Sequence, residues 1–279
     1  MPQVVLITGC STGIGRDLAQ RLTQAGYTVV ATARRTETLN DLQAALKLPL
    51  DVTQPNSIDE AVARTLQQFG RIDVLVNNAG YALRGALEEV AGEQVQQMFD
   101  VNVFGALRMI QAVAPQMRRQ GAGRIINISS IAGKCSTPVN GVYSASKFAL
   151  EALSDALRVE LQPFGIQVVV VEPGAIKTHF DETALAHARD ILSNSASPYQ
   201  RLYRKSDEFA DSMRRQESGP DAVSRVIQQA IETPRSKARY VAGVDFSGRL
   251  VLRLRDFVWD TVLQHIFKLE PAASNSLEK

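Results

Sequence analysis

A glycine-rich segment stands directly after the first apolar run and constrains the fold more than any other feature. Val4–Thr8 reads as a strand, Gly9–Gly15 follows with the spacing G-x-x-x-G-x-G, and Arg16–Ala25 reads as a helix that Gly26 ends. Glycines let a backbone turn tightly and approach a pyrophosphate, and the helix N-terminus offers free N–H groups to phosphates. The spacing departs from the G-x-G-x-x-G fingerprint, so a purely structural strand-to-helix turn is the alternative.

Short β-branched runs alternate with helical segments along the chain. They are Val4–Thr8, Thr28–Ala33, Val74–Asn77, Arg124–Ser129 and Gln167–Glu172, with Tyr240–Gly243 as a last candidate strand. Such alternation is typical of βαβ units and predicts an α/β fold of the Rossmann type, a doubly wound parallel sheet flanked by helices. Since no linker or repeat interrupts it, we expect one domain over residues 1–270, with a helical substrate lid at 179–217 and a flexible tail at 271–279.

Composition excludes several classes of protein. The 279 residues are 45% hydrophobic and 22% charged, which is ordinary for a globular chain. A net charge of +2 is too small to indicate nucleic acid as a partner. Cys10 and Cys135 match no disulfide or metal framework, which favours a reducing compartment such as the cytoplasm, and the three histidines lack metal spacing, so no metal is expected. The N-terminal apolar run is too short for a signal peptide, and no stretch reaches the roughly 18 apolar residues of a spanning helix.

Two arginines end the second predicted strand. An NAD-specific site carries an acidic residue at this point for the ribose 2′-hydroxyl, whereas an arginine there holds a 2′-phosphate. Arg34 and Arg35 occupy the position, so the sequence favours NADP(H) over NAD(H). The alternative is a pair of solvated arginines on a loop.

Tyr143 and Lys147 stand four residues apart and share a face if the segment is helical. The pKa of a free tyrosine, about 10, is high for a base, but a neighbouring ammonium favours the phenolate and lowers it. The pair therefore has the chemistry of a tuned general acid/base, although most such pairs are surface contacts. Ser129 and Ser130 lie where a predicted strand ends, at the edge where open α/β sheets bind ligands; a serine there either holds a substrate oxygen or caps a helix.

Together these residues resemble the short-chain dehydrogenases/reductases of the non-extended type. The resemblance runs from about Val4 to Thr178, and more loosely to Gly243. Six motifs stand in the family's order: the turn Thr8–Gly15, the pair Asp51-Val52, the segment Asn77–Gly80, Asn102, the set Ser130, Tyr143 and Lys147, and Pro173-Gly174 leading to Thr178. As a combination they are highly specific.

The resemblance implies a role for each matched residue. Tyr143 would be the acid/base, Ser130 would orient the substrate oxygen, and Lys147 would lower the pKa of Tyr143 and bind the nicotinamide ribose. Asn102 would hold a water that links Lys147 to solvent. The remaining implied cofactor contacts are Gly9, Ser11, Thr12, Gly13, Ile14 and Gly15 in the turn, Asp51 and Val52 at the adenine, Asn78, Ala79 and Gly80 on the adenosine side, and Pro173 and Gly174 before Ile176 and Thr178 at the nicotinamide carboxamide.

The implied reaction moves a hydride between the nicotinamide ring and a carbonyl or secondary alcohol. Segments such as Tyr143–Glu151 resemble the branch that holds 17β-hydroxysteroid and retinol dehydrogenases, which favours a lipophilic, steroid- or retinoid-like substrate or a small ketone. The aromatic residues of 179–217 and His179 would line an apolar pocket, or simply pack a lid onto the body.

The sequence also bears on the partners of the protein. The basic, apolar segment Arg249–Trp259 suits either a membrane surface or packing on its own domain or a neighbouring subunit, which we favour. The family usually forms dimers or tetramers through the helices after Asn102 and Tyr143, so a homodimer or homotetramer is expected. Small residues there include Gly105, Ala106, Ala149, Ala152 and Ala156.

Two other functions are alternatives to the oxidoreductase hypothesis. A catalytically silent NADP(H)-binding sensor would need only the glycine-rich half, so the intact set of Ser130, Tyr143 and Lys147 argues against it. A sugar-nucleotide epimerase shares the tyrosine and lysine, but the glycine spacing and the limited length after Thr178 argue against that activity.

Overall fold

The computed structural model describes residues 2–178, 180–214, 217–253 and 255–267. Within them, seven parallel strands form one sheet in the order β3-β2-β1-β4-β5-β6-β7. The strands are β1 (Val4–Ile7), β2 (Thr28–Ala33), β3 (Leu46–Pro49), β4 (Val74–Asn77), β5 (Gly123–Ile128), β6 (Ile166–Pro173) and β7 (Arg239–Ala242). The chain winds outward from β1 to β3 and then returns to β4 on the other side of β1. The predicted doubly wound, Rossmann-type sheet is therefore confirmed.

Each predicted strand is present with bounds that differ by one residue at most, and β3 is an addition. The strand β3 escapes prediction because its four residues alternate leucine with Lys47 and Pro49, an unremarkable pattern for a strand. It lies at the edge of the sheet, where a proline is tolerated, and it buries Leu48 completely.

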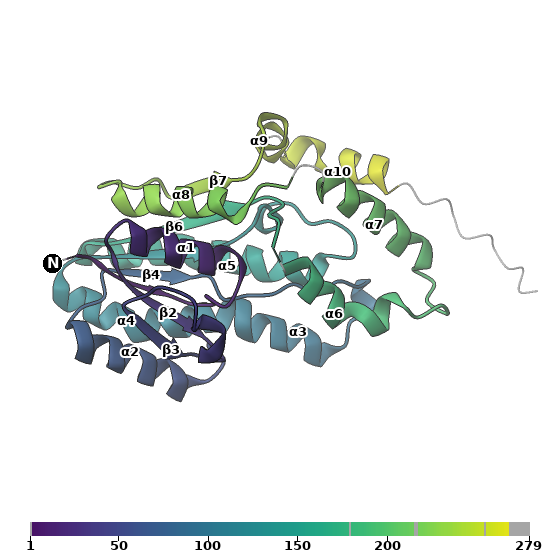
Figure 1. Cartoon of the computed structure of the whole chain (residues 1–279). Coiled ribbons are helices and arrows are strands. Elements are labelled where there is room, and N and C mark those ends of the chain that lie inside the picture. Colours follow the sequence, from purple (N-terminus) through teal and green to yellow (C-terminus); the bar gives the residue numbers. More distant parts are fainter. Residues whose placement is uncertain (1, 179, 215–216, 254, 268–279) are drawn as a thin grey trace, which may run out of the picture.

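Helices cover both faces of the sheet. They include α1 (Gly13–Gln24), α2 (Pro55–Phe69), α3 (Gly92–Phe99), α4 (Ala106–Gln120), α5 (Gly141–Leu161) and α8 (Pro220–Glu232). Figure 1 shows α1 and α8 on one face, with α2 and α4 on the other. The side chains of β1 alternate accordingly: Val5 and Ile7 pack with α1 and α8, whereas Val4 and Leu6 pack with α2 and α4.

Short helical turns connect these elements. They are the 3-10 turns η1 (Thr36–Leu39), η2 (Leu87–Glu89), η4 (Ile131–Gly133) and η5 (Gln162–Phe164), and the π-helix η3 (Asp100–Gly105) between α3 and α4. Gly26 has a φ of +86° just beyond α1, as expected of a glycine that ends a helix.

The C-terminal third adds α6 (Phe180–Leu192), α7 (Gln200–Arg214), α9 (Phe246–Arg253) and α10 (Arg255–Ile266). Figure 1 shows α6 and α7 beyond the end of the sheet, with α10 beside α7, and the ring of Phe267 packs on that of Phe209. Trp259 donates a 2.9 Å hydrogen bond from its indole N–H to the carbonyl oxygen of Ser136, so α10 packs on the body of the protein. None of the described helices is both long and apolar enough to cross a membrane.

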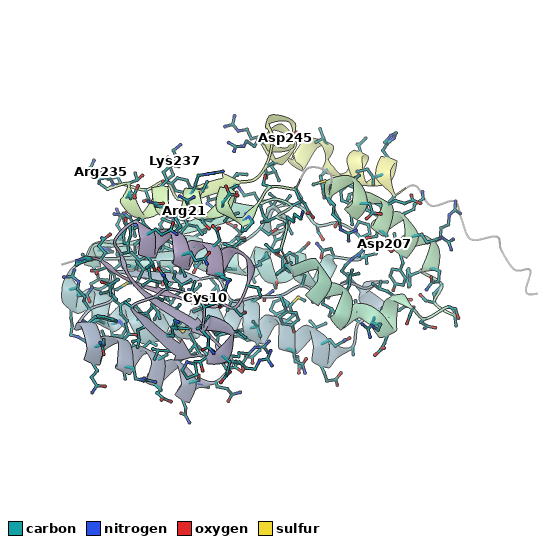
Figure 2. All side chains as sticks on the ribbon, in the orientation of Figure 1. Cys10, Arg21, Asp207, Arg235, Lys237 and Asp245 are labelled. Atoms are coloured by element: carbon teal, nitrogen blue, oxygen red, sulfur yellow. The ribbon has the colours of Figure 1, made fainter. Side chains whose placement is uncertain are left out.

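The predicted lid falls on α6 and α7, and its movement remains a prediction. Arg84 of the body forms a 2.9 Å ion pair with Asp207 of α7, which is labelled in Figure 2. His179, residues 215–216 and the predicted tail at 271–279 lie outside the described residues.

Candidate active site

The glycine-rich turn after β1 has a backbone that favours glycine. Gly9 has a φ of +73° and Gly13 a φ of +60°, both in the left-handed region. At Gly15, an added Cβ would lie 2.4 Å from the carbonyl oxygen of Gly9, so the turn closes tightly on itself. The turn is completed by Ser11, Thr12 and Ile14.

Two residues far apart in sequence brace this turn. The hydroxyl oxygen of Thr8 accepts hydrogen bonds from the backbone N–H groups of Asn78 and Ala79, both at 2.9 Å. The side-chain amide of Asn78 donates in return to the carbonyl oxygens of Thr8 (2.9 Å) and Gly9 (3.0 Å). The predicted contact residues after β4 are thus tied to the turn after β1, at the point where the winding of the sheet reverses.

The N-terminus of α1 is suited to an anion. Thr12 caps the helix without a side-chain hydrogen bond, and the first turn of α1 carries no acidic residue. A cavity of about 480 Å³ adjoins this turn, and its lining includes Gly13, Lys177 and Thr178 together with the oppositely charged Arg16 and Asp17. Backbone amides, the positive end of a helix dipole and the Lys177 ammonium suit the phosphates of a dinucleotide.

Arg34 and Arg35 follow β2 and are both exposed. The loop after them is held by Arg16 of α1, which donates to the carbonyl oxygen of Thr38 at 3.0 Å and pairs with Asp41 at 2.5 Å. The same contact with Arg16 lowers the pKa of Asp41. The two arginines are therefore presented to solvent on an anchored loop, at the carboxyl end of the sheet.

The predicted adenine contacts lie beyond β3. Asp51 is half-buried and accepts hydrogen bonds from the backbone N–H (2.9 Å) and the hydroxyl (2.7 Å) of Thr53. Val52 is buried against η3, since an added Cβ on Gly105 would lie 2.7 Å from its Cγ2 atom. This contact joins the predicted adenine contacts to the π-helix that carries Asn102.

The segment after β6 returns to the glycine-rich turn. Pro173-Gly174 closes the strand, and the side chain of Ile176 faces Gly243, where an added Cβ would come within 2.7 Å of it. Thr178 lies against Gly13, with 3.3 Å between its Cγ2 atom and the position of an added Cβ. The structure therefore brings Thr178 to the turn and packs the side chain of Ile176 into the core.

Tyr143 and Lys147 lie on one buried face of α5, as their spacing predicts; they are 9% and 6% exposed. The Lys147 ammonium is 5.7 Å from the centroid of the Tyr143 ring and donates a 2.8 Å hydrogen bond to the carbonyl oxygen of Ile128, where β5 ends. Burial lowers the pKa of Lys147 to about 8, and the Glu151 carboxylate opposes that shift. An ammonium and a phenol thus share one desolvated site.

Ser130 follows β5 and caps η4, because its Oγ atom accepts a 3.1 Å hydrogen bond from the backbone N–H of Ala132. The capping role predicted as an alternative is therefore present. Ala132 packs in the same apolar cluster as Tyr143, so the turn η4 that Ser130 caps lies against the helix that carries Tyr143. Ser129 is more deeply buried than Ser130, at 3% exposure.

Asn102 is buried within η3, and its side chain is already engaged. Its Oδ1 atom accepts from the backbone N–H of Tyr81 at 3.0 Å, and its amide donates to the carbonyl oxygen of Tyr81 (2.9 Å) and to Ser146 (3.1 Å). Gly80 lies between two predicted site residues: an added Cβ would be 3.1 Å from Asn102 and 3.7 Å from the Lys147 nitrogen. The predicted motif after β4 therefore meets the lysine directly.

Apolar side chains surround the tyrosine. The ring of Phe180, at the start of α6, stands edge-on to the Tyr143 ring with 5.6 Å between centroids. The same cluster includes Leu83, Met98, Val142, Ala184 and Ala188. Helix α6 therefore covers the phenol with hydrocarbon.

Sequence reasoning missed three residues that shape this site. Two of them are Arg16, which donates to the carbonyl oxygen of Ser11 in the turn at 3.4 Å, and Glu151, which acts on Lys147 through the field of its buried charge. The third is Glu172, which is buried and pairs with Lys134 and Arg239. Phe180 belongs to the aromatic residues predicted to line a pocket, and it packs on Tyr143. For Glu151, the eight-residue spacing after Tyr143 was a signal, because it continues the face of Tyr143 and Lys147 by one more turn.

Comparison with known proteins agrees with this geometry. The family model described as short chain dehydrogenase matches residues 3–189. The human 17-beta-hydroxysteroid dehydrogenase type 1 is 38% identical over 268 residues, which cover 91% of this chain and 81% of that protein.

Solved structures agree as well. A short-chain dehydrogenase from Streptomyces avermitilis has a TM-score of 0.78 at 34% identity, covering 95% of this chain and 99% of that one. A short-chain dehydrogenase/reductase from Burkholderia phymatum, solved with NAD, has a TM-score of 0.78 at 25% identity and covers 99% of this chain and 98% of its own. An actinorhodin polyketide ketoreductase variant, solved with NADPH, has a TM-score of 0.74 at 30% identity, covering 86% and 95%.

Proposed function

Because the chain belongs to the short-chain dehydrogenase family, we propose that it is an NADP(H)-dependent oxidoreductase that moves a hydride between the nicotinamide ring and a carbonyl or secondary alcohol. The observation that carries this proposal is the buried pair of Tyr143 and Lys147 at the carboxyl end of β5. A buried ammonium beside a buried phenol costs the fold stability, and such groups gather where chemistry needs them.

The bound nicotinamide supplies or accepts the hydride. In reduction, Tyr143 donates its hydroxyl proton to the substrate oxygen, and in oxidation the same oxygen atom accepts that proton. The Lys147 ammonium stabilises the phenolate, and the Ser130 hydroxyl orients the substrate oxygen. Asn102 would hold a water that links Lys147 to solvent. Because its side chain already hydrogen-bonds to Tyr81 and Ser146, we assign that contact to the backbone of Asn102.

The preference for NADP(H) rests on Arg34 and Arg35. Both guanidinium groups are exposed where β2 ends, and the sequence has no acidic residue at that point. Arginine binds phosphate through two parallel hydrogen bonds, so either residue suits a 2′-phosphate. NAD(H) is the less favoured cofactor.

The proposed substrate is lipophilic, of steroid or retinoid type, or a small ketone. Support comes from the hydrocarbon around Tyr143, above all Phe180 and the rest of its cluster. Apolar area that a substrate buries there contributes about 25 cal/mol per Å² to binding.

We also propose a homodimer or homotetramer, formed through α5. Its outer face carries an apolar stripe of Ala145, Phe148, Ala152, Ala156 and Val159, of which Val159 is 70% exposed. Gly105, the last residue of η3, and Ala106, the first of α4, were expected to aid this contact and are buried within the protein instead. The cytoplasm is the proposed compartment, since Cys10 and Cys135 form no disulfide, a state that a reducing environment preserves.

Binding of NADPH and NADH is first measured by fluorescence titration, and absorbance is then followed with ketosteroids, retinal and small ketones. The variant Tyr143→Phe is the control, because it removes only the hydroxyl. Turnover of NADPH that requires Tyr143 supports the proposal and identifies the substrate class. Tight NADPH binding with turnover that Tyr143→Phe leaves unchanged contradicts it.

A further inference from the structure

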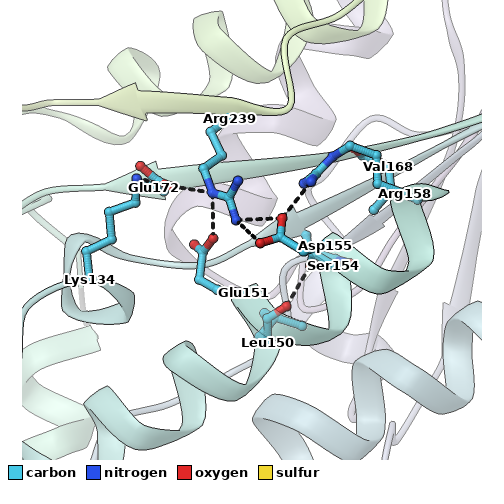
Figure 3. Close-up of polar contacts among 10 residues, drawn as sticks. Lys134, Leu150, Glu151, Ser154, Asp155, Arg158, Val168, Glu172 and Arg239 are labelled. Carbon is cyan, nitrogen blue, oxygen red and sulfur yellow. Dashed lines mark hydrogen bonds and ion pairs between the residues drawn. The ribbon is translucent and has the colours of Figure 1, made fainter.

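A network of charged side chains lies behind the predicted catalytic face of α5. Figure 3 shows Arg239 of β7 reaching between α5 and β6. Its Nε atom is 3.0 Å from Glu151 and 3.4 Å from Glu172, and its Nη2 atom is 2.6 Å from Asp155. The remaining cations are Lys134, 3.1 Å from Glu172, and Arg158, 2.5 Å from Asp155.

Within this network, Glu151 is the carboxylate whose charge acts on Lys147. It follows Lys147 by four residues on α5, so the two side chains stand one turn apart on the same buried face. Glu151 is 7% exposed, and its Oε1 atom accepts no hydrogen bond from any residue in the described part of the chain. A buried carboxylate with an unshared oxygen favours a positive charge beside it.

The turn η4 closes over this part of the helix. An added Cβ on Gly133 would lie 3.2 Å from Cγ of Glu151 and 3.3 Å from the carbonyl carbon of Lys147. Contact this close leaves little room for water between η4 and α5, so the field of Glu151 is weakly screened there.

We propose that Glu151, held in place by Arg239, is a positioning residue that keeps the Lys147 ammonium charged beside Tyr143. The inference rests on the proposed function, because it assigns Lys147 its part in proton transfer. Glu151 acts through Lys147 and does not touch the substrate. Arg239 fixes the carboxylate, and Lys134 balances the neighbouring Glu172, whose pKa is raised by burial and by Glu151.

The charge of Lys147 is measured directly in the full chain without cofactor, by ¹³C NMR of lysine labelled at the ε-carbon. The resonance that Lys147→Met lacks is assigned to Lys147, and its midpoint is followed with pH. Glu151→Gln removes a neighbouring negative charge, so the midpoint falls by about one pH unit or more. Glu151→Asp keeps the charge and restores most of the wild-type midpoint.

The matched control is Asp155→Asn, which removes a carboxylate from the same Arg239 at a site two turns beyond Lys147. Its midpoint stays within about 0.3 pH units of the wild type, because distance and exposure weaken the field. If Glu151→Gln fails to fold, Glu151→Gln combined with Arg239→Met replaces the buried pair by neutral side chains and still lowers the midpoint.

Activity gives the second readout. Carbonyl reduction needs Tyr143 and Lys147 both protonated, so the alkaline decline of kcat/KM moves to lower pH in Glu151→Gln and not in Asp155→Asn. An unchanged NMR midpoint overturns the inference, and so does a lowered midpoint with an unmoved alkaline decline. Wild-type turnover that does not need Tyr143 would instead overturn the proposed function, whatever the NMR midpoint.

Discussion

The ring of Phe180 stands edge-on to the ring of Tyr143, with 5.6 Å between their centroids. A residue of α6 thereby forms part of the wall around the phenol. Phe180→Ala is expected to raise KM for a lipophilic ketone by about tenfold or more, because the substrate loses apolar contact area. KM for a small ketone should change little. Phe209→Ala is the matched control, since that ring packs on Phe267; equal effects of the two variants would contradict the assignment.

Replacing Arg34 tests the choice of cofactor. Arg34→Asp puts a carboxylate at the end of β2, where it repels a 2′-phosphate and accepts a hydrogen bond from a 2′-hydroxyl. The dissociation constant for NADPH should rise by about tenfold or more, while that for NADH should hold or fall. Arg35→Asp, measured beside it, identifies which arginine carries the contact. Parallel weakening of both nucleotides in both variants would count against a 2′-phosphate site here.

The tight glycine-rich turn predicts that alanine substitutions at two glycines, Gly15 and Gly92, affect nucleotide binding very differently. In Gly15→Ala the new methyl group would lie 2.4 Å from the carbonyl oxygen of Gly9, so the turn must open and nucleotide binding should be lost. At Gly92, an added Cβ meets nothing within 4 Å, and Gly92→Ala should bind like the wild type. Fluorescence titration with NADPH compares them. Undisturbed binding by Gly15→Ala would refute the placement of the phosphates.

Lys147 is expected to lower the stability of the folded protein although the reaction needs it. Burial lowers its pKa from the ordinary value of 10.5 to about 8. Below about pH 8 the folded protein therefore carries a buried charge, which reduces the free energy of unfolding. Lys147→Met is therefore expected to be inactive yet more stable at pH 7, by about 2 kcal/mol. This gain in stability over the wild type should shrink as the pH rises from about 8 and vanish above about 10.5, because Lys147 is then neutral in both the folded and the unfolded state. Urea unfolding across this range would show it; a less stable variant at pH 7 would argue against the assigned cost.

Arg124 should be a stability residue without a part in catalysis. Its guanidinium donates to the carbonyl oxygens of Ala230, Ile231 and Thr233, at the C-terminus of α8. Arg124→Met removes these three hydrogen bonds and a cation from the negative end of the helix, a loss of about 2–4 kcal/mol in the free energy of unfolding. The hydroxyl of Ser236 still donates to the carbonyl oxygens of Ala230 and Thr233. Arg225→Met, which breaks only an exposed pair on the same helix, should cost about 0.5 kcal/mol or less. Equal costs would be incompatible with this role.

Much of the fold could be predicted because its signals are local. β-branched runs mark the inner strands, and the glycines after β1 mark the turn through backbone conformations that other residues avoid. The strand β3 could not be predicted, since an edge strand of four residues with Lys47 and Pro49 has no distinctive pattern. The π-helix η3 also has no local sequence signal. Its last residue, Gly105, packs on Val52, which lies 53 residues earlier in the sequence.

The site divides in the same way. Tyr143 and Lys147 could be paired from their spacing, because an α-helix fixes which residues share a face. Arg239 could not be assigned to Glu151, 88 residues away, because only the pairing of β6 with β7 brings them together. A charge network of this kind depends on the strand topology. Its members lie far apart in the sequence, so no short stretch of residues indicates which of them pair.

The contact between Thr8 and Asn78 also constrains the order in which the protein assembles. The two residues are 70 positions apart, and neither the hydroxyl of Thr8 nor the amide of Asn78 finds these partners until β4 has docked beside β1. The glycine-rich turn consequently lacks this brace until β4 has paired with β1, although its residues emerge first from the ribosome. A growing chain of fewer than about 80 residues would carry every glycine of the turn and still lack the brace that shapes it, so nucleotide capture would begin only after the central strands have joined.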